Sequence, residues 1–357
     1  MMKKYYSISE TAEILGVSKE TLRRWDNSGK FKSSRNPINN YRVYTYEQIQ
    51  DFINEMEITY TKQKSLGYKE LQPYFETSLG KLYHYDALDF LKQMESNSVD
   101  LIFADPPYNI KKTYWDKFSS QKEYLDWSLE WISEAHRVLT ERGSLYICGF
   151  SEILADIKYI AAPLFKGVKW LIWYYRNKAN LTNDWGRSHE SILHFRKSKH
   201  FIFNIDEVRI PYNAHTIKYP HRTQAETSQY ANAKKKKYAW TPHPLGAKPK
   251  DVFEIPTISN NAWEKFPHPT QKPVELLRKI ILASSLPDSL IFDPFGGSGT
   301  TFAVAEAYGR KWIGTEKEKN YCEIIKKRLN DPIHIQRIAS EKDTRASHHR
   351  RKKLRGK

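Results

Sequence analysis

Residues 99–108 read Val99-Asp100-Leu101-Ile102-Phe103-Ala104-Asp105-Pro106-Pro107-Tyr108. An apolar run that stops at two prolines is typical of a buried parallel strand that ends abruptly in a rigid loop. In an open α/β sheet, ligands bind in the crevice beyond the carboxyl ends of the strands. We therefore expect a strand over 99–104 and, directly after it, a binding or catalytic site at Asp105, Pro106, Pro107 and Tyr108. An ordinary turn is the alternative, because Asp and Pro are common turn residues.

The segments around this run alternate between predicted strands and predicted helices. Strands are predicted at 81–86, 143–149, 168–176, 191–196 and 311–316, and helices at 87–94, 121–139, 274–284 and 320–329. Residues 289–301 read as a further strand, a glycine-rich turn and the start of a helix. This alternation predicts an α/β fold with a parallel-rich sheet.

The glycine-rich turn predicts a second ligand-binding element. It reads Phe292-Asp293-Pro294-Phe295-Gly296-Gly297-Ser298-Gly299-Thr300, and glycines there let the backbone approach a ligand closely. Thr300 stands where a nucleoside-triphosphate loop has its lysine, so a triphosphate site is not expected. Glu316 ends the next strand, where dinucleotide-binding folds place an acidic side chain that accepts hydrogen bonds from ribose hydroxyls.

Composition points to a polyanionic partner in a reducing compartment. The 357 residues carry a formal net charge of +17, for which nucleic acid is the simplest partner. Cys148 and Cys322 are the two cysteines, both in apolar surroundings, so neither a disulfide framework nor a zinc site is expected. No apolar run approaches the length of a membrane span and no signal-peptide core is present, so we expect a cytoplasmic protein.

The N-terminal residues predict a helix-turn-helix. Ser7 and Glu10 fit a capping box, and Gly16 supplies a tight turn before a second helix over 19–27 that Ser18 caps. This second helix is basic outside and apolar inside, which suits entry into a DNA groove. A hairpin wing over 31–44 and a helix from 46 to about 56 follow. The DNA-binding candidates in this region are Lys19, Thr21, Arg23, Arg24, Arg35 and Arg42.

We expect four segments along the chain, the third of which contains an insert. They are a helix-turn-helix domain over 1–58, a linker over 59–78, a catalytic domain over 79–332 and a basic, disordered tail over 333–357. Within the catalytic domain, residues 199–265 lose helix and strand periodicity and predict an irregular, basic target-recognition insert outside the core. Lys234, Lys235, Lys236 and Lys237 are its DNA-binding candidates.

Three motifs resemble those of the DNA amino-methyltransferases that use S-adenosylmethionine. They are Asp105-Pro106-Pro107-Tyr108, His268-Pro269-Thr270-Gln271-Lys272-Pro273 and the glycine-rich turn, in an order that resembles the permuted beta class. The N-terminal residues resemble the winged helix-turn-helix of the mercury-responsive (MerR) regulators and of phage excisionases. The resemblance implies a seven-stranded, mostly parallel sheet with one reversed strand.

The resemblance also implies roles for individual residues. Asp105 and the Pro106 carbonyl would accept hydrogen bonds from an exocyclic amine, and Tyr108 would stack on the flipped base. Glu316 would bind ribose and Thr270 and Lys272 the cofactor's carboxylate, with no metal required. The full set of cofactor-binding candidates is Asp86, Asp105, Thr270, Lys272, Asp293, Pro294, Phe295, Gly297, Ser298, Gly299, Thr300 and Glu316.

The family pattern favours N6 of adenine in duplex DNA over N4 of cytosine, where serine commonly replaces the aspartate. A restriction-modification role with a cognate endonuclease is expected, and a homodimer is considered. Two other classes stay open at this point. One is a DNA-binding regulator that uses the methyltransferase fold only to sense the cofactor, and the other is an RNA or protein-glutamine methyltransferase.

Overall fold

The computed structural model describes residues 5–15, 17, 19–37, 39–54, 71–109, 118–176, 183–224 and 238–340. The chain divides into two compact units, Met1–Gln72 and Pro73–Lys357, which are described separately below. No helix among the described residues is both long and apolar enough to cross a membrane.

The first unit is a small helical domain with a three-stranded sheet. Its elements are β1 (Tyr5–Ser7), α1 (Ile8–Ile14), α2 (Lys19–Ser28), β2 (Ser34–Arg35), β3 (Arg42–Thr45) and a helix over residues 46–54. The strands pair antiparallel in the order β1-β3-β2, so β2 and β3 form the predicted wing.

Local sequence explains how this unit begins. The Ser7 hydroxyl accepts from the Glu10 amide and the Glu10 carboxylate accepts from the Ser7 amide, which confirms the predicted capping box. Leu22 is buried in the core of the unit and Trp25 packs against it, as the helix pattern predicts. The predicted turn at Gly16 and cap at Ser18 lie outside the described residues.

The candidate DNA-binding residues of this unit lie at its surface. On α2, Lys19, Arg23 and Arg24 are exposed and Thr21 is half-buried. In the wing, Arg35 is exposed, whereas Arg42 donates from Nε to Asp26 Oδ2 over 2.6 Å and ties the wing to α2.

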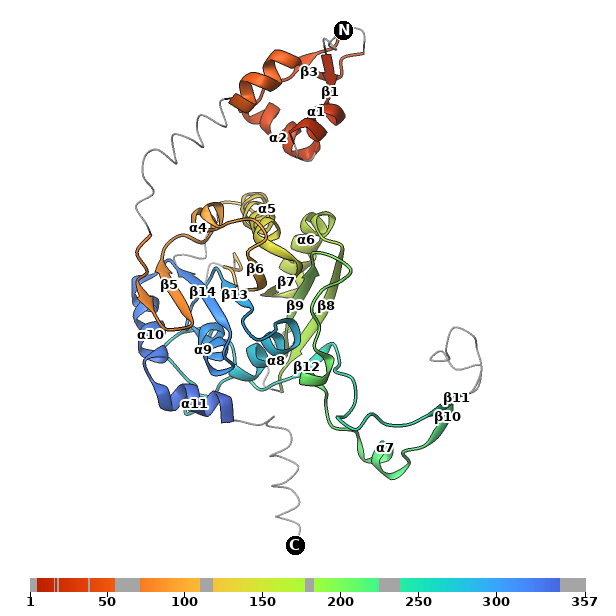
Figure 1. Cartoon of the computed structure of the whole chain (residues 1–357), viewed down its shortest axis with the longest axis vertical. Coiled ribbons are helices and arrows are strands. Elements are labelled where there is room, and N and C mark those ends of the chain that lie inside the picture. Colours follow the sequence, from red (N-terminus) through yellow and green to blue (C-terminus); the bar gives the residue numbers. More distant parts are fainter. Residues whose placement is uncertain are drawn as a thin grey trace. The chain divides into compact units, whose positions relative to one another are not determined.

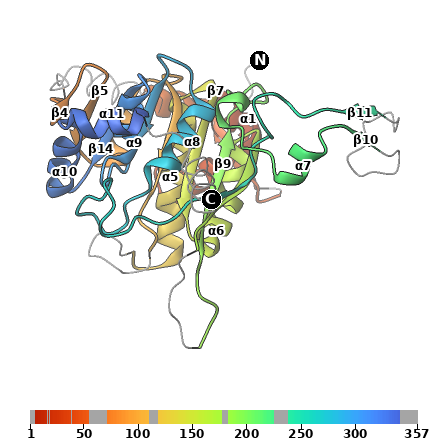
Figure 2. The same cartoon turned by 90° about the horizontal axis from the view of Figure 1, so that it is seen from below.

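The second unit is built on a nine-stranded sheet between two layers of helices (Figures 1 and 2). The sheet order is β12-β8-β9-β7-β6-β13-β14-β5-β4. Its strands are β4 (Phe75–Glu76), β5 (Gly80–His84), β6 (Val99–Ala104), β7 (Leu139–Gly149), β8 (Gly167–Tyr174), β9 (His189–Arg196), β12 (Val252–Glu254), β13 (Leu290–Asp293) and β14 (Lys311–Glu316).

Helices cover both faces of this sheet. One face carries α4 (Ala87–Gln93), α5 (Gln121–Val138) and α6 (Ser151–Ala161). The other carries α8 (Val274–Ser284), α9 (Thr300–Ala307), α10 (Lys319–Leu329) and α11 (Pro332–Ser340). The central strands are apolar on both faces, since Leu101, Ile102 and Phe103 on β6 are all buried, which is the pattern that a doubly covered parallel sheet requires.

Strand direction matches the expected mostly parallel sheet, with two additions at its edges. The inner seven strands, from β8 to β5, include one reversed strand, β9, which pairs antiparallel with β7 and β8. The short strand β12 adds in parallel beside β8, and β4 adds antiparallel beside β5, so the sheet has nine strands rather than the expected seven.

Three segments predicted to lie outside the core contain strands or helices in the structure, because some of their apolar residues are buried. The segment predicted as a linker over 59–78 contains β4, and Phe75 packs against the main hydrophobic core. The segment predicted as an irregular insert over 199–265 contains β12 and the buried residue Ile255. The tail predicted to be disordered from 333 contains α11, whose Ile338 is buried in the same core.

Before β12, one part of the insert packs against the helix layer and another part projects from it. The insert contains the 3-10 helix η2 (Ile205–Val208), which packs against α8, then the short helix α7 (Ala214–Lys218) and a hairpin of β10 (Arg222–Gln224) with β11 (Tyr238–Trp240). Both views show α7 and the hairpin projecting away from the nine-stranded sheet (Figures 1 and 2). Lys234, Lys235, Lys236 and Lys237 lie outside the described residues.

Candidate active site

The sequence motifs meet at one edge of the sheet. The carboxyl ends of β6, β13, β14 and β5 deliver Asp105, the glycine-rich turn, Glu316 and Asp86, respectively. The reversed strand β9 begins at the same edge, so its second residue, Glu190, joins them. This is the position at which an open α/β sheet binds its ligands.

Both carboxylate oxygens of Asp105 are engaged by the protein's own side chains. The Tyr108 hydroxyl donates to Oδ1 over 2.5 Å, and the Lys272 ammonium donates to Oδ2 over 2.5 Å. Lys272 also lies 3.6 Å from Glu190 Oε2, so one ammonium is shared between two carboxylates. The Lys272 side chain is only 7% exposed. Burial alone would lower the pKa of Lys272, but Asp105 and Glu190 outweigh burial and raise that pKa above its ordinary value.

Tyr108 is held on two sides. Its hydroxyl lies 3.3 Å from Glu190 Oε2 in addition to its bond with Asp105, and its ring contacts Phe150 edge-on at a centroid distance of 5.0 Å. Burial and the neighbouring carboxylates raise the pKa of Tyr108 well above its ordinary value, so the hydroxyl stays protonated and acts as a donor.

The two proline carbonyls of the motif differ in their partners. The Tyr124 hydroxyl of α5 donates to the Pro107 carbonyl over 2.9 Å, which anchors the loop to the helix layer. Within the part of the chain that the structure describes, no donor reaches the Pro106 carbonyl. The acceptor that the sequence assigns to the target amine is therefore unpaired among these residues.

A cavity of about 430 Å³ lies beside this cluster. Seven of the twelve cofactor-binding candidates line it, namely Asp86, Asp105, Thr270, Pro294, Phe295, Gly297 and Glu316. Its remaining wall includes the rings of Phe118, Trp127 and Tyr321. The carboxylates and aromatic rings of its lining give this cavity the chemistry of a site for a polar ligand with a flat, apolar portion.

The glycine-rich turn and Glu316 form one hydrogen-bonded unit at this cavity. Glu316 Oε2 accepts from the Gly297 amide over 2.8 Å, and Oε1 accepts from the Glu318 amide over 2.7 Å. Burial raises the pKa of Glu316 to about 7, although both amide donors oppose that shift. Gly297 has φ of +52°, a left-handed conformation that favours glycine, so the turn can bring this amide to the carboxylate without strain.

Four other candidates lie behind the turn. Lys272, Asp293, Ser298 and Thr300 line a smaller cavity of about 30 Å³ that shares Asp105 with the larger one. Asp293 accepts from the Thr301 hydroxyl over 2.5 Å and from the Phe295 amide over 3.0 Å, so it fixes the turn. Burial raises the pKa of Asp293 to about 7. Gly299 lines neither cavity and is the N-cap of α9, with φ of +73°.

Asp86 both caps a helix and lines the larger cavity. Its carboxylate caps α4 by accepting from the Leu88 amide over 3.0 Å, and it pairs with Lys317 over 3.1 Å at the rim of the larger cavity. The cap contact by itself explains why a carboxylate follows this strand. The contact of Asp86 with a ligand therefore stays a prediction.

Sequence reasoning missed Glu190, His268 and the aromatic wall. The predicted strand began at 191, one residue after Glu190, so this carboxylate was left outside the predicted strand. His268 lines both cavities, and burial lowers its pKa to about 4, so it is neutral. The signal that could have found Glu190 is an acidic residue, preceded by the polar His189, directly before a predicted strand.

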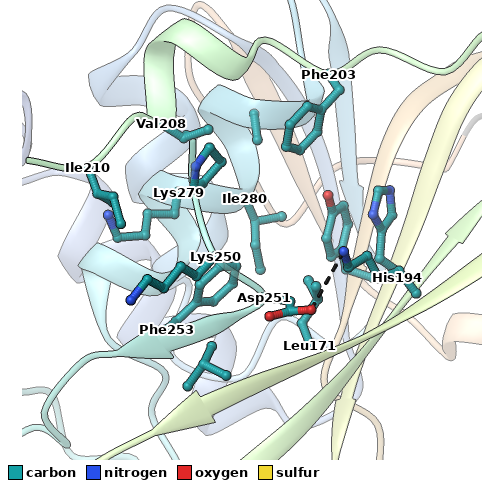
Figure 3. Close-up of a pocket in the computed structure, with 15 residues that line it drawn as sticks. Leu171, His194, Phe203, Val208, Ile210, Lys250, Asp251, Phe253, Lys279 and Ile280 are labelled. Atoms are coloured by element: carbon teal, nitrogen blue, oxygen red, sulfur yellow. Dashed lines mark ion pairs between the residues drawn. The ribbon is translucent and has the colours of Figure 1, made fainter. Parts of the chain in front are cut away.

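A second cavity, of about 120 Å³, lies between β8, β9 and α8 (Figure 3). It contains none of the predicted catalytic or cofactor-binding residues and has mostly apolar walls, among them Leu171, Phe253 and Ile280. The ion pair of Lys169 with Asp251 lies at its edge. We assign the chemistry to the larger cavity because the acidic groups and the glycine-rich turn converge there.

Comparison with known proteins places the chain in a family. Residues 99–327 match the family described as DNA methylase, and residues 6–53 match the MerR helix-turn-helix family of regulatory proteins. The DNA adenine methyltransferase YhdJ of Escherichia coli K12 is 38% identical over 256 residues, which cover 70% of this chain and 83% of that protein. The type II methyltransferase M.HpaI of Haemophilus parainfluenzae is 35% identical over 250 residues, which cover 69% of this chain and 72% of that protein.

The chain therefore belongs to the DNA methylase family of enzymes. Among solved structures, the cytosine-N4-specific PvuII DNA methyltransferase shares the fold with a TM-score of 0.55. It is 20% identical and the match covers 76% of this chain and 97% of that one.

Proposed function

We propose that this protein transfers the methyl group of S-adenosylmethionine to N6 of an adenine that is rotated out of duplex DNA. Membership of the DNA methylase family supports the reaction class, and the name of the adenine-methylating relative supports the base. The observation that carries the proposal is the position of Asp105. It lines the larger cavity, which fits the methyl donor, and its carboxylate lies beside Tyr108, the residue that would stack on the base.

The residues around the larger cavity fit the cofactor. Glu316, fixed by two backbone amides, presents a carboxylate edge for ribose hydroxyls, and Phe295 with Trp127 supplies apolar walls for an adenine ring. Thr270 and Asp86 would hold the polar end. When bound, S-adenosylmethionine supplies a methyl group that its positive sulfur already activates.

The chain's own groups then prepare the nucleophile. An exocyclic amine is a poor nucleophile because its lone pair is delocalised into the ring. Hydrogen bonds from its N–H groups to Asp105 and to the Pro106 carbonyl favour a pyramidal nitrogen and turn the lone pair toward the methyl group. Tyr108 stacks on the base and holds it outside the duplex.

The motif order supports membership of the beta class, and the type II relatives support a restriction-modification role with a cognate endonuclease. The exposed basic residues of α2 and the projecting part of the insert would contact the duplex, the latter as the target-recognition region. A homodimer on DNA remains part of this proposal. The whole reaction takes place without a metal ion.

The alternative base is cytosine N4, which the fold of the PvuII enzyme also accommodates. Incubating the protein with labelled S-adenosylmethionine and duplex DNA, and then hydrolysing the DNA to nucleosides, tests the proposal. Label in N6-methyladenine supports it, label in N4-methylcytosine favours the alternative, and absence of transfer contradicts the enzyme activity.

A further inference from the structure

Glu190 is a carboxylate of the candidate active site that the proposed reaction does not use. Glu190 lies at the start of β9, and its Oε2 atom lies 3.3 Å from the Tyr108 hydroxyl, 3.5 Å from the Cys148 thiol and 3.6 Å from the Lys272 ammonium. The Lys272 ammonium and the Cys148 thiol therefore face one oxygen of Glu190, and the Tyr108 hydroxyl, whose proton is donated to Asp105, lies beside them.

The charges of this cluster do not cancel. Asp105 and Glu190 face a single cation, Lys272, in a site where their side chains are 17%, 16% and 7% exposed, respectively. Burial raises the pKa values of Tyr108 and Cys148 well above their ordinary values, so these two donors are neutral. The cluster carries one net negative charge when both carboxylates are ionised.

Binding of a target amine to Asp105 would affect the contact between Asp105 and Lys272. Asp105 already accepts from Tyr108 on one oxygen and from Lys272 on the other, so an incoming N–H group would share an oxygen with a donor that is already bound. An ammonium at that place is also unfavourable for the reaction, because the amine nitrogen gains positive charge as it is methylated and like charges repel.

Lys272 cannot leave Asp105 without another partner. A buried ammonium that loses its carboxylate is strongly destabilised. Among the described residues, Glu190 is the other carboxylate in ion-pair contact with it, 1.1 Å farther away than Asp105, as the difference between 3.6 and 2.5 Å shows. The ammonium thus already lies within ion-pair distance of both carboxylates.

We propose that Glu190 is a positioning residue that receives the Lys272 ammonium from Asp105 when the target amine binds. This inference rests on the proposed function, because it assumes that Asp105 accepts a hydrogen bond from the amine. The transfer frees one oxygen of Asp105 for the substrate and keeps the lysine charge paired. Glu190 thereby acts on the reaction through Lys272 and does not itself contact the base.

The test compares Glu190→Gln with wild type in single-turnover methyl transfer, at saturating duplex and saturating S-adenosylmethionine. We expect Glu190→Gln to lower the rate at least tenfold while the dissociation constants of the cofactor and of the duplex change less than twofold. A purely structural role would instead weaken binding or folding together with the rate. Glu190→Asp keeps the charge and is expected to be faster than Glu190→Gln.

Glu275→Gln is the matched control. Glu275 is 15% exposed and also pairs with two cations, Arg278 and Lys279, but it lies outside the cluster. We expect its transfer rate to stay within twofold of wild type. A rate for folded Glu190→Gln within threefold of wild type, or a Glu190→Asp rate no higher than that of Glu190→Gln, would overturn the role of Glu190. Absence of methyl transfer by the wild-type protein would instead contradict the proposed function.

Discussion

The Gly297 amide donates a hydrogen bond to Glu316 Oε2 over 2.8 Å. This contact joins the turn after β13 to the end of β14, two parallel neighbours in the sheet. It gives the carboxylate a fixed orientation at the wall of the larger cavity. The ribose-binding role of Glu316 therefore depends on the backbone of the glycine-rich turn as well as on its own side chain.

Cofactor affinity should depend on pH through Glu316. Burial raises its pKa to about 7, so the carboxylate is protonated below that pH and loses acceptor strength for ribose hydroxyls. We expect the dissociation constant of S-adenosylmethionine to rise by up to roughly tenfold per pH unit below the pKa and to level off above it. Calorimetric titrations between about pH 5.5 and 8.5 measure this. In Glu316→Gln the affinity should be lower and nearly independent of pH, and an unchanged profile would contradict the assignment.

Removing the Asp105 side chain should stop the methyl-transfer step. Asp105→Ala deletes the acceptor for the amine, and we expect the rate to fall by about a hundredfold or more, as for other oriented groups at a reacting centre. Asp105→Asn keeps one carbonyl acceptor and should fall between Asp105→Ala and wild type. Asp126→Ala removes an exposed aspartate of α5 and serves as the control, with an expected change below twofold. Equal rates for Asp105→Ala and wild type would be incompatible with the mechanism.

Tyr108 should act mainly through its ring. Tyr108→Phe keeps the stacking surface and loses the hydroxyl, so we expect a rate within about tenfold of wild type, whereas Tyr108→Ala loses stacking energy of about 1–3 kcal/mol. Base rotation can be followed with 2-aminopurine in place of the target adenine, since its fluorescence rises on unstacking. We expect the fluorescence increase to persist in Tyr108→Phe and to shrink in Tyr108→Ala. A reversed order of the two variants would argue against stacking.

The exposed arginines of α2 should contribute salt-dependent DNA affinity. Replacing both Arg23 and Arg24 by alanine removes up to two phosphate contacts, so the slope of log affinity against log salt concentration should fall by up to about two. Fluorescence anisotropy with a labelled duplex over a salt series measures the slope. Lys122→Ala, which removes one exposed positive charge from α5, is the control and should leave the slope unchanged. Equal slopes for the arginine variant and wild type would show that α2 does not contact DNA.

The sequence predicted those parts of the fold that local pattern determines. The strand over 99–104 and the strand over 311–316 were predicted with the bounds that β6 and β14 have. For β6 the reason is an apolar run that ends abruptly at two prolines. The short edge strands β4 and β12 were not predicted, because two or three residues are too few to show a strand periodicity. They form strands because they hydrogen-bond to the edge strands β5 and β8. The seven-residue helix α1 was predicted because its capping box is a local signal.

The candidate site shows the same division. Asp105, Glu316 and Gly297 belong to contiguous motifs and were found from sequence, and they meet at the cavity. Glu190 was missed because its partners are far away in the sequence. Tyr108 lies 82 residues before it and Lys272 lies 82 residues after it. Only the antiparallel pairing of β9 with β7 brings this carboxylate beside the catalytic motif.

The identity of the methylated base tests the account most directly. DNA from cells that express the protein, sequenced with detection of modified bases and compared with DNA from cells that express Asp105→Ala, reports base, position and target sequence together. The account predicts N6-methyladenine at one defined sequence with wild type and none with the variant. N4-methylcytosine, or N6-methyladenine that persists with Asp105→Ala, would contradict it.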